Sequence, residues 1–159
     1  MQVQVSLSAR PKSPKHAATA WVLVFDGSQG KFLMLKRAKK TNNPNLWNFP
    51  GGGTDGKAAV AGAKRELLEE AGIAVKKSDL QYISGSLDGT ITYFLLLLPE
   101  TPQLRIDPKE SSKHKWMTMD EIAALGNKLH SKTSLFMAQN INRRLVNMAI
   151  RKSDLPSTT

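Results

Sequence analysis

The stretch GGGTDGKAAVAGAKRELLEEAGI, residues 51–73, joins a glycine-rich turn to a helical pattern that carries closely spaced carboxylates. Glu66, Glu69 and Glu70 stand at positions i, i+3 and i+4, which project from one side of a helix. Because neighbouring carboxylates repel one another, this spacing favours a bound hard cation, Mg²⁺ or Mn²⁺, held through oxygen ligands. Arg65, which lies four residues before Glu69, can hold a carboxylate in a fixed orientation.

The predicted helix also has an apolar side. Small apolar residues recur there at helical spacing: Val60, Ala63, Leu67 and Ala71. Gly72 follows the last turn, at a position where helices commonly end in a left-handed residue. The glycines at 51–53 allow the backbone to approach a ligand closely. We therefore expect a helix that packs on a sheet through one side and presents its acids to a cleft through the other.

The stretch resembles the Nudix box, G-x5-E-x7-R-E-U-x-E-E-x-G-U, in which U is a bulky aliphatic residue. The residues that match this pattern at the expected spacing are Gly51, Arg65, Glu66, Leu67, Glu69, Glu70, Gly72 and Ile73. Lys57 departs from it, because the box has a glutamate there. The loop before Lys57 is also shorter than the common form of the family, and Asp55 could replace the lost charge. The segment LWNFP, residues 46–50, is similar to the lead-in of family members.

This resemblance implies a fold and a reaction. The expected fold is a single domain over residues 1–159 of the α/β class, a Nudix-type α/β/α sandwich with a mixed central β-sheet. The expected reaction is Mg²⁺- or Mn²⁺-dependent hydrolysis, with one to three ions, of the pyrophosphate bond in a nucleoside diphosphate linked to a group X. The substrate could be a nucleoside triphosphate, a dinucleoside polyphosphate, a nucleotide sugar or ADP-ribose. Two alternatives remain open: a catalytically weak Nudix fold that binds nucleotide, and an RNA 5′-end pyrophosphohydrolase.

The resemblance also implies roles for individual residues. Those expected to hold metal ions are the carbonyl of Gly51 and the side chains of Glu66, Glu69 and Glu70. Catalytic roles are expected for Arg65, Glu66, Glu69 and Glu110. Glu110 precedes a W-x-x-x-[DE]-E-[IL] segment, residues 116–122, as a metal-binding or catalytic glutamate often does in the family. Either Glu66 or Glu110 could be the base, and an exposed loop acid is the alternative interpretation of Glu110.

A basic cluster follows the second predicted strand, at residues 36–40. Arg37 is the first choice for a phosphate contact, because a planar guanidinium can bind two oxygens at once. Lys39 is the second choice, and a solvated basic loop is the alternative for the whole cluster. Gly52 and Lys57 are also expected beside the phosphates of the substrate.

Composition narrows the class of partner. The chain has 159 residues and a formal net charge of +10, which implies nucleotide phosphates, nucleic acid or a membrane surface. A small nucleotide also explains the acids, whereas scattered basic residues make RNA less favoured. The lack of cysteine excludes disulfides, thiolate zinc sites and cysteine nucleophiles, and fits a reducing, cytoplasmic setting. No apolar run is long enough to span a bilayer, and family habit suggests a monomer or homodimer.

Alternation and turn residues predict the strands. An edge strand with a loose basic connector is expected within residues 1–15, and further strands are expected at 16–25, 31–35, 80–85 and 90–98. The last two strands should form a hairpin around Asp88-Gly89. Trp21 could lie in the core or stack on a base. Trp47 and Phe49 should pack beneath the predicted helix of the Nudix box, which we call the box helix.

Helical spacing predicts the C-terminal part of the chain. Thr118 should cap a helix with Glu121 as its capping-box partner. One helix is expected over residues 131–151, followed by a frayed tail at 154–159. The predicted packing face of this helix consists of Leu135, Ala138, Ile141, Leu145, Met148 and Ala149.

Overall fold

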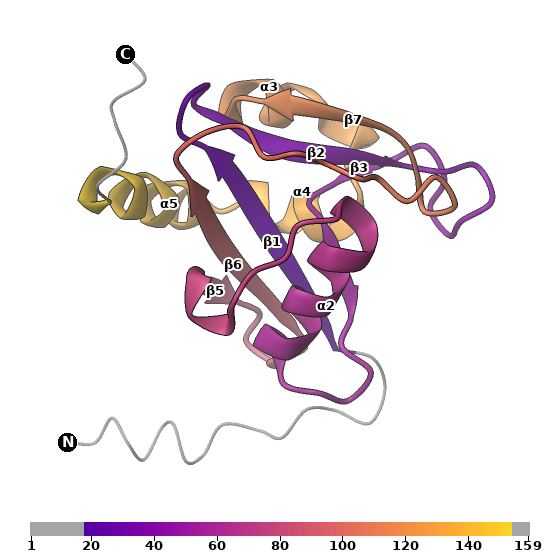
Figure 1. Cartoon of the computed structure of the whole chain (residues 1–159), viewed down its shortest axis with the longest axis horizontal. Coiled ribbons are helices and arrows are strands. Elements are labelled where there is room, and N and C mark those ends of the chain that lie inside the picture. The colour runs from indigo at the N-terminus through magenta and orange to yellow at the C-terminus, as the bar shows by residue number, and fades with distance from the viewer. Residues whose placement is uncertain (1–17, 154–159) are drawn as a thin grey trace.

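The structure is a computed structural model that describes residues 18–153, and a mixed β-sheet forms its centre (Figure 1). The strands in these residues are β1 (Thr19–Asp26), β2 (Lys31–Arg37), β3 (Trp47–Asn48), β4 (Gly51–Gly53), β5 (Leu80–Gly85), β6 (Ile91–Leu98) and β7 (Ser111–Met117). They lie in the order β3-β2-β1-β6-β5, with β4 paired to β1 and β7 paired to β2. The edge strand expected within residues 1–15 and the tail at 154–159 lie outside the described residues.

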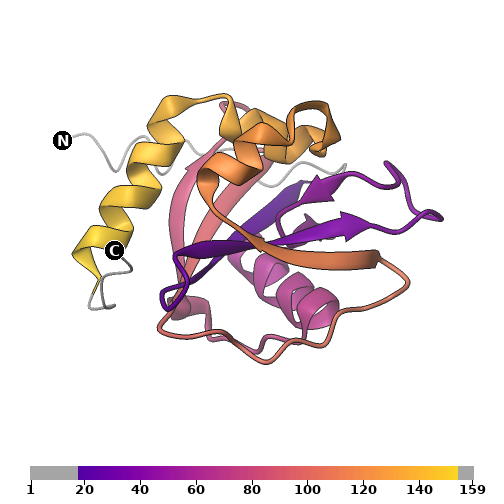
Figure 2. The same cartoon turned by 90° about the horizontal axis from the view of Figure 1, so that it is seen from above.

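Helices cover both faces of the sheet (Figure 2). Helix α2 (Ala59–Ala71) lies on one face, and α3 (Met119–Ala124), α4 (Ser131–Met137) and α5 (Asn140–Lys152) lie on the other. Two short 3-10 helices, η1 (Lys77–Asp79) and η2 (Gly126–Lys128), complete the connections. This arrangement is the predicted α/β/α sandwich with a mixed sheet. No helix in residues 18–153 is long and apolar enough to cross a bilayer.

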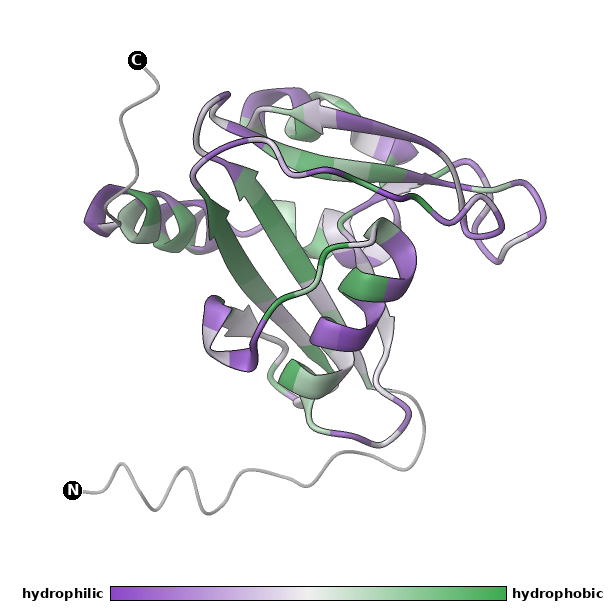
Figure 3. Ribbon diagram, viewed as in Figure 1, coloured by the Kyte–Doolittle hydropathy of each residue, from purple (hydrophilic) through white to green (hydrophobic). Residues whose placement is uncertain are grey.

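The central strands β1 and β6 run parallel and are apolar on both sides (Figure 3). Every residue of β1 from Ala20 to Asp26 is buried, because helices cover both faces and neighbouring strands cover both edges. The predicted hairpin around Asp88-Gly89 is confirmed as β5 and β6, which pair antiparallel. Thr118 caps α3 in a capping box with Glu121, as predicted.

The α2 face contains the predicted stripe of small residues. Ala63, Leu67 and Ala71 are fully buried against strand residues of the sheet, and Val60 packs at their margin. The other face has a larger cluster that includes Trp21, Phe49, Tyr93, Phe136 and Val146. The small residues on α2 let its backbone approach the sheet closely, which places the acidic side of the helix beside β4.

The prediction of one helix over residues 131–151 is wrong, because the chain breaks between α4 and α5. The buried side chain of Asn142 donates a hydrogen bond to the carbonyl of Phe136 at 3.0 Å, which satisfies the end of α4 and turns the chain. The break changes which residues face the core. Phe136, Val146 and Ala149 are buried, whereas four members of the predicted packing face stay exposed: Leu135, Ala138, Ile141 and Met148.

The aromatic residues before the box helix also lie on the other side from the one predicted. Phe49 packs edge-on against Phe136 of α4, with 5.6 Å between ring centroids, rather than beneath α2. Trp47 packs against the same cluster. Phe49 therefore belongs to the core cluster on the opposite face of the sheet from α2. Trp21 is a core residue, because only 4% of it is exposed.

Candidate active site

The glycine-rich strand β4 fixes the start of the site. Gly51, Gly52 and Gly53 pair antiparallel with Trp21, Ala20 and Thr19 of β1. Gly51 has a φ of 151°, and a Cβ atom there would lie 2.3 Å from the carbonyl oxygen of Ala20. Only glycine fits this position, because any side chain would collide with the backbone of β1.

Glu70 is the most buried acid of the box helix. Its carboxylate accepts a hydrogen bond from the backbone N–H of Gly51 at 2.7 Å, and only 7% of the residue is exposed. The pKa of Glu70 is raised to about 8, mainly by burial. The negative charges of Glu66 and Glu110 add to this rise, whereas the hydrogen bond from Gly51 and the charge of Arg37 oppose it. An added positive charge beside Glu70 would therefore be strongly favoured.

Glu66 lies next to Glu70 and reaches back over β4. A Cβ atom at Gly52 would stand 3.1 Å from a carboxylate oxygen of Glu66, so the glycine leaves room for this side chain. Burial raises the pKa of Glu66, Arg65 lowers it, and nearby acids including Glu110 raise it again. The two inward carboxylates and the backbone of β4 thus line one wall of the site with oxygen atoms.

Arg65 organises the outer part of the site. Its guanidinium donates a hydrogen bond to the carbonyl of Gly53 at 2.7 Å. It also forms ion pairs with Asp55 at 3.3 Å and with Glu66 and Glu69 at 3.4 Å. The expected contact between Arg65 and a carboxylate is therefore present. Asp55 is close enough to Glu66 for its negative charge to raise the pKa of that carboxyl.

The three acids do not converge as the spacing suggested. Successive residues of a helix are about 100° apart, so Glu69 and Glu70 diverge although each lies near Glu66. Glu70 points inward, whereas the Glu69 side chain is 56% exposed and pairs with Arg65. Within residues 18–153 no three acids or histidines are arranged to hold a metal ion. Glu69 would have to leave Arg65 to join such a site.

Glu110 is brought to the site by a backbone strap, which we define as residues 105–110. The N–H groups of Arg105 and Asp107 bond to the carbonyls of Ala71 and Glu70 at 2.8 and 3.0 Å. The N–H of Glu110 then bonds to the carbonyl of Asp107 at 3.2 Å. The charge of Glu110 raises the pKa values of Glu66 and Glu70. The strap therefore places this exposed acid opposite the box helix.

The predicted phosphate-binding residues are not equally close to the acids. Arg37 stands at the end of β2, and its Nε donates to the carbonyl of Asn42 at 2.6 Å. Its charge lowers the pKa of Glu70, so Arg37 is near enough to the buried acid for their charges to interact. Lys39 and Lys57 are exposed, and neither forms an ion pair with another residue in the described part of the chain.

His130 is a polar residue near the site that the sequence did not reveal. It is buried, its ring lies 5.4 Å from that of Trp21, and its Nε2 is 3.5 Å from the amide nitrogen of Asn43. Burial lowers the pKa of His130, and the charges of Arg37 and Lys132 lower it further. Its contact with Asn43 spans 87 positions of the chain, and no local pattern indicates such a contact.

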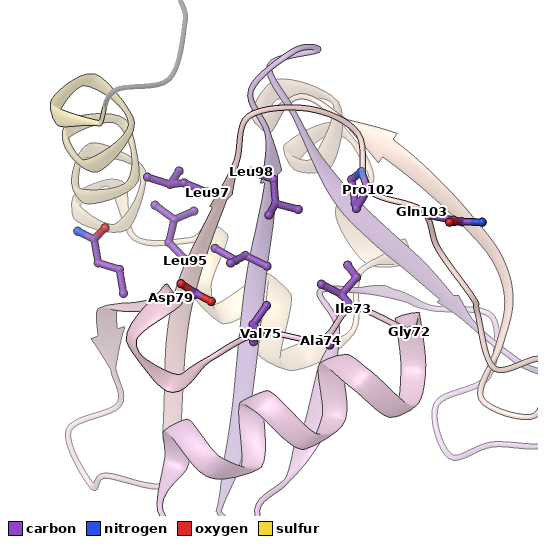
Figure 4. A pocket seen from close by; sticks show the side chains of 12 residues that line it. Gly72, Ile73, Ala74, Val75, Asp79, Leu95, Leu97, Leu98, Pro102 and Gln103 are labelled. Atoms are coloured by element: carbon purple, nitrogen blue, oxygen red, sulfur yellow. The ribbon is translucent and has the colours of Figure 1, made fainter.

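A separate cavity of about 480 Å³ lies beyond the C-terminal end of α2 (Figure 4). Ile73, Val75, Leu98 and Pro102 surround it. Asp79 is the only charged residue among the described ones that line it. Because it contains neither a cation nor the acids of the box, this cavity is a poor place for a polyphosphate, and we assign the site to the acids beside β4.

The family described as NUDIX domain matches residues 15–137 of the chain. No curated protein shows significant similarity to it. Among solved structures, the Ap4A hydrolase of C. elegans, in a binary complex, is 19% identical, with 84% of this chain and 98% of that chain covered and a TM-score of 0.61. The MutT protein of Methanosarcina mazei Go1 is 19% identical, with 90% and 99% covered and a TM-score of 0.59. The E. coli dihydroneopterin triphosphate pyrophosphohydrolase is 21% identical, with 81% and 94% covered and a TM-score of 0.57.

Proposed function

The chain belongs to the NUDIX family of pyrophosphohydrolases, and from this premise we propose that it uses Mg²⁺ or Mn²⁺ to hydrolyse a nucleoside diphosphate linked to a second group. The observation that carries the proposal is the pair of inward acids, Glu66 and Glu70, set against the backbone of β4. Structural neighbours named for Ap4A and for dihydroneopterin triphosphate share the fold, so the proposal specifies a nucleotide-type polyphosphate and leaves the group X open.

The residues present fit a hard divalent cation. Glu66, Glu70 and Glu110 offer only oxygen donors, and the buried carboxyl of Glu70 has a pKa raised to about 8, which a cation would reverse. We propose that Glu66 and Glu70 hold the ion with the carbonyl of Gly51, and that Glu69 joins them on leaving Arg65. When bound, the ion would neutralise phosphate charge and make a bound water more acidic.

The side chains of the chain itself provide the remaining steps. Glu66 is the proposed base that removes a proton from the attacking water, because burial raises its pKa toward neutral pH. Arg65 orients Glu66 through their 3.4 Å ion pair. Arg37 binds a phosphate of the substrate through its planar guanidinium. Glu110, the other candidate base, is more exposed and would offer a further oxygen ligand to the ion.

The proposal is tested with purified protein and a panel of dNTPs, dinucleoside polyphosphates, nucleotide sugars and ADP-ribose. Phosphate or nucleotide release is measured across a titration of Mg²⁺ and Mn²⁺. We expect turnover of at least one substrate class, which Glu66→Gln reduces by about 10² or more because a general base is lost. A larger loss in Glu110→Gln than in Glu66→Gln would reassign the base.

A second candidate is a degenerate Nudix fold that binds nucleotide without turnover. Two observations favour it: Lys57 replaces the usual glutamate, and Glu69 is turned away from Glu70 toward Arg65. Such a module would bind nucleotides in the presence of millimolar Mn²⁺, measured by calorimetry, without releasing phosphate. Turnover of any compound in the panel would exclude it.

A further inference from the structure

Strand β5 forms one edge of the sheet. In residues 18–153 its only strand partner is β6, so its other side presents unpaired backbone N–H and C=O groups. The pairing with β6 shifts between Tyr82 and Ser84, which leaves Ile83 as a bulged residue. Unpaired edges are ready to accept another strand, and proteins usually cover or charge them. The side chains of β5, LQYISG, carry no charge to prevent such pairing.

A groove runs between β5 and α5, and we call it the β5 groove. It contains two hollows of about 160 and 200 Å³, and Leu145 lines both. The first hollow also meets Ile83 and Met148, and the second meets Leu135 and Ile141. Met148, Leu135 and Ile141 are 43, 43 and 52% exposed, so large apolar side chains face solvent along the whole groove.

One polar atom in the second hollow lacks a partner. The Oγ of Ser84 is buried and makes no hydrogen bond with any atom of the described residues. A buried hydroxyl without a partner costs free energy, so such groups are normally paired. Ser84 stands on the edge strand itself, where the carbonyl of an added backbone would be the natural acceptor.

The described chain begins near this groove. The N–H of Thr19 bonds to the carbonyl of Thr90 at 2.8 Å, and Ala20 and Gly85 both pair with Thr92 of β6. A strand added beside β5 would lie three strand spacings from β1, about 14 Å. Residues 9–17, which would connect the added strand to Ala18, can span about 30 Å when extended, which is enough to reach the groove.

The first residues of the chain also have the required chemistry. Val3, Val5 and Leu7 alternate with Gln4 and Ser6, so an extended segment would place its apolar side chains on one side. No charged side chain occurs before Arg10. A second copy of the chain is a poorer occupant, because pairing two β5 edges would bring together two copies of the exposed cations of α5: Arg144, Arg151 and Lys152.

We propose that residues 2–8 occupy the β5 groove as an added strand beside β5. Val3, Val5 and Leu7 fill the two hollows, and Ser84 donates its hydroxyl hydrogen to a carbonyl of the added strand. This inference is independent of the catalytic activity. It assigns the edge of the sheet to the chain's own N-terminus rather than to a partner protein.

A pair of cysteines tests the proposal, since the chain has none of its own. In the full-length protein, Val5→Cys is combined with Leu145→Cys, and the matched control combines Gln4→Cys with Leu145→Cys. Each protein is oxidised at low micromolar concentration, and mass spectrometry measures disulfides within one chain. We expect at least about fivefold more disulfide with the cysteine at position 5, because neighbouring positions of a strand point to opposite sides. Equal yields, or disulfides that join two chains, would overturn the proposal.

Amide hydrogen exchange gives an independent test. The full-length Val3→Asp, Val5→Asp double variant should exchange the amides of residues 81–85 about tenfold faster than the unaltered chain, because carboxylates cannot enter the hollows. The amides of α2 report whether the variant remains folded. Adding a synthetic peptide of residues 1–10 should restore slow exchange at β5. Unchanged exchange at residues 81–85 in a folded variant would contradict the proposal.

Discussion

Replacing Glu70 with glutamine should make the metal-free protein more stable at neutral pH. The folded-state pKa of Glu70 is raised from 4.5 to about 8, with burial as the main cause. A carboxyl with a raised pKa contributes its full stability below pH 4.5, where it is protonated in both states. As the pH rises from 4.5 toward 8, the unfolded chain loses this proton while the folded chain retains it, so the free energy of unfolding falls.

The structure sets the size of this effect. Each unit of pKa difference corresponds to about 1.4 kcal/mol, so between pH 4.5 and 7 the ionisable Glu70 costs about 3 kcal/mol of stability. A glutamine at this position would keep an acceptor for the N–H of Gly51 but could not ionise. Glu70→Gln should therefore match the unaltered protein at pH 4.5 and exceed it by about 3 kcal/mol at pH 7.

Urea unfolding in the presence of EDTA measures this difference at several pH values between 4.5 and 8. Glu100→Gln, which removes an exposed carboxylate, is the matched control and should follow the pH dependence of the unaltered protein. Adding Mg²⁺ should stabilise the unaltered protein more at pH 8 than at pH 6, since the proton on Glu70 competes with the ion. Parallel stability curves for Glu70→Gln and the unaltered protein would refute the reasoning.

Three further changes test other parts of the site. Lys57→Glu should lower the Mg²⁺ concentration needed for half-maximal hydrolysis several-fold, because it exchanges an exposed cation for the usual acid of the box; a higher requirement in the metal titration would contradict this. Arg65→Lys should reduce kcat by about tenfold or more, because one ammonium cannot hold the Gly53 carbonyl and three acids at once; unchanged steady-state kinetics would show that the fork is dispensable. Gly51→Ala should lower Tm and abolish activity, because its Cβ would lie 2.3 Å from the Ala20 oxygen; a thermal melt like that of the unaltered protein would disprove the clash.

Local spacing predicted the parts of the fold that local interactions determine. The stripe of Ala63, Leu67 and Ala71 indicated how α2 packs, and the turn at Asp88-Gly89 indicated the hairpin. The box spacing correctly placed the acids on one helix. It overstated their convergence, because about 100° of helix separates Glu69 from Glu70 and the ion pairs of Arg65 draw Glu69 outward.

The failures arose where a single side-chain contact, rather than the periodicity of apolar residues, decides the outcome. The break after α4 depends on the side chain of Asn142, which bonds back to Phe136. Helical periodicity gives no sign of this bond, because asparagine is an ordinary residue on a helix surface. The backbone N–H of Phe49 bonds to Thr133, which lies 84 positions later in the sequence. The ring of His130 contacts the side chain of Asn43, which lies 87 positions earlier. The alternation of apolar residues cannot identify such pairs.

The strap, residues 105–110, connects Glu110 to helix α2 and determines where this part of the chain can accept insertions or deletions. Two backbone hydrogen bonds join residues 105 and 107 to the last turn of α2, so a movement of that turn would also move Glu110. The distance between Glu110 and the acids of α2 is therefore set by these backbone hydrogen bonds rather than by side-chain contacts. Insertions or deletions around residues 99–104 should leave this distance unchanged, whereas one residue inserted between 107 and 110 should change it.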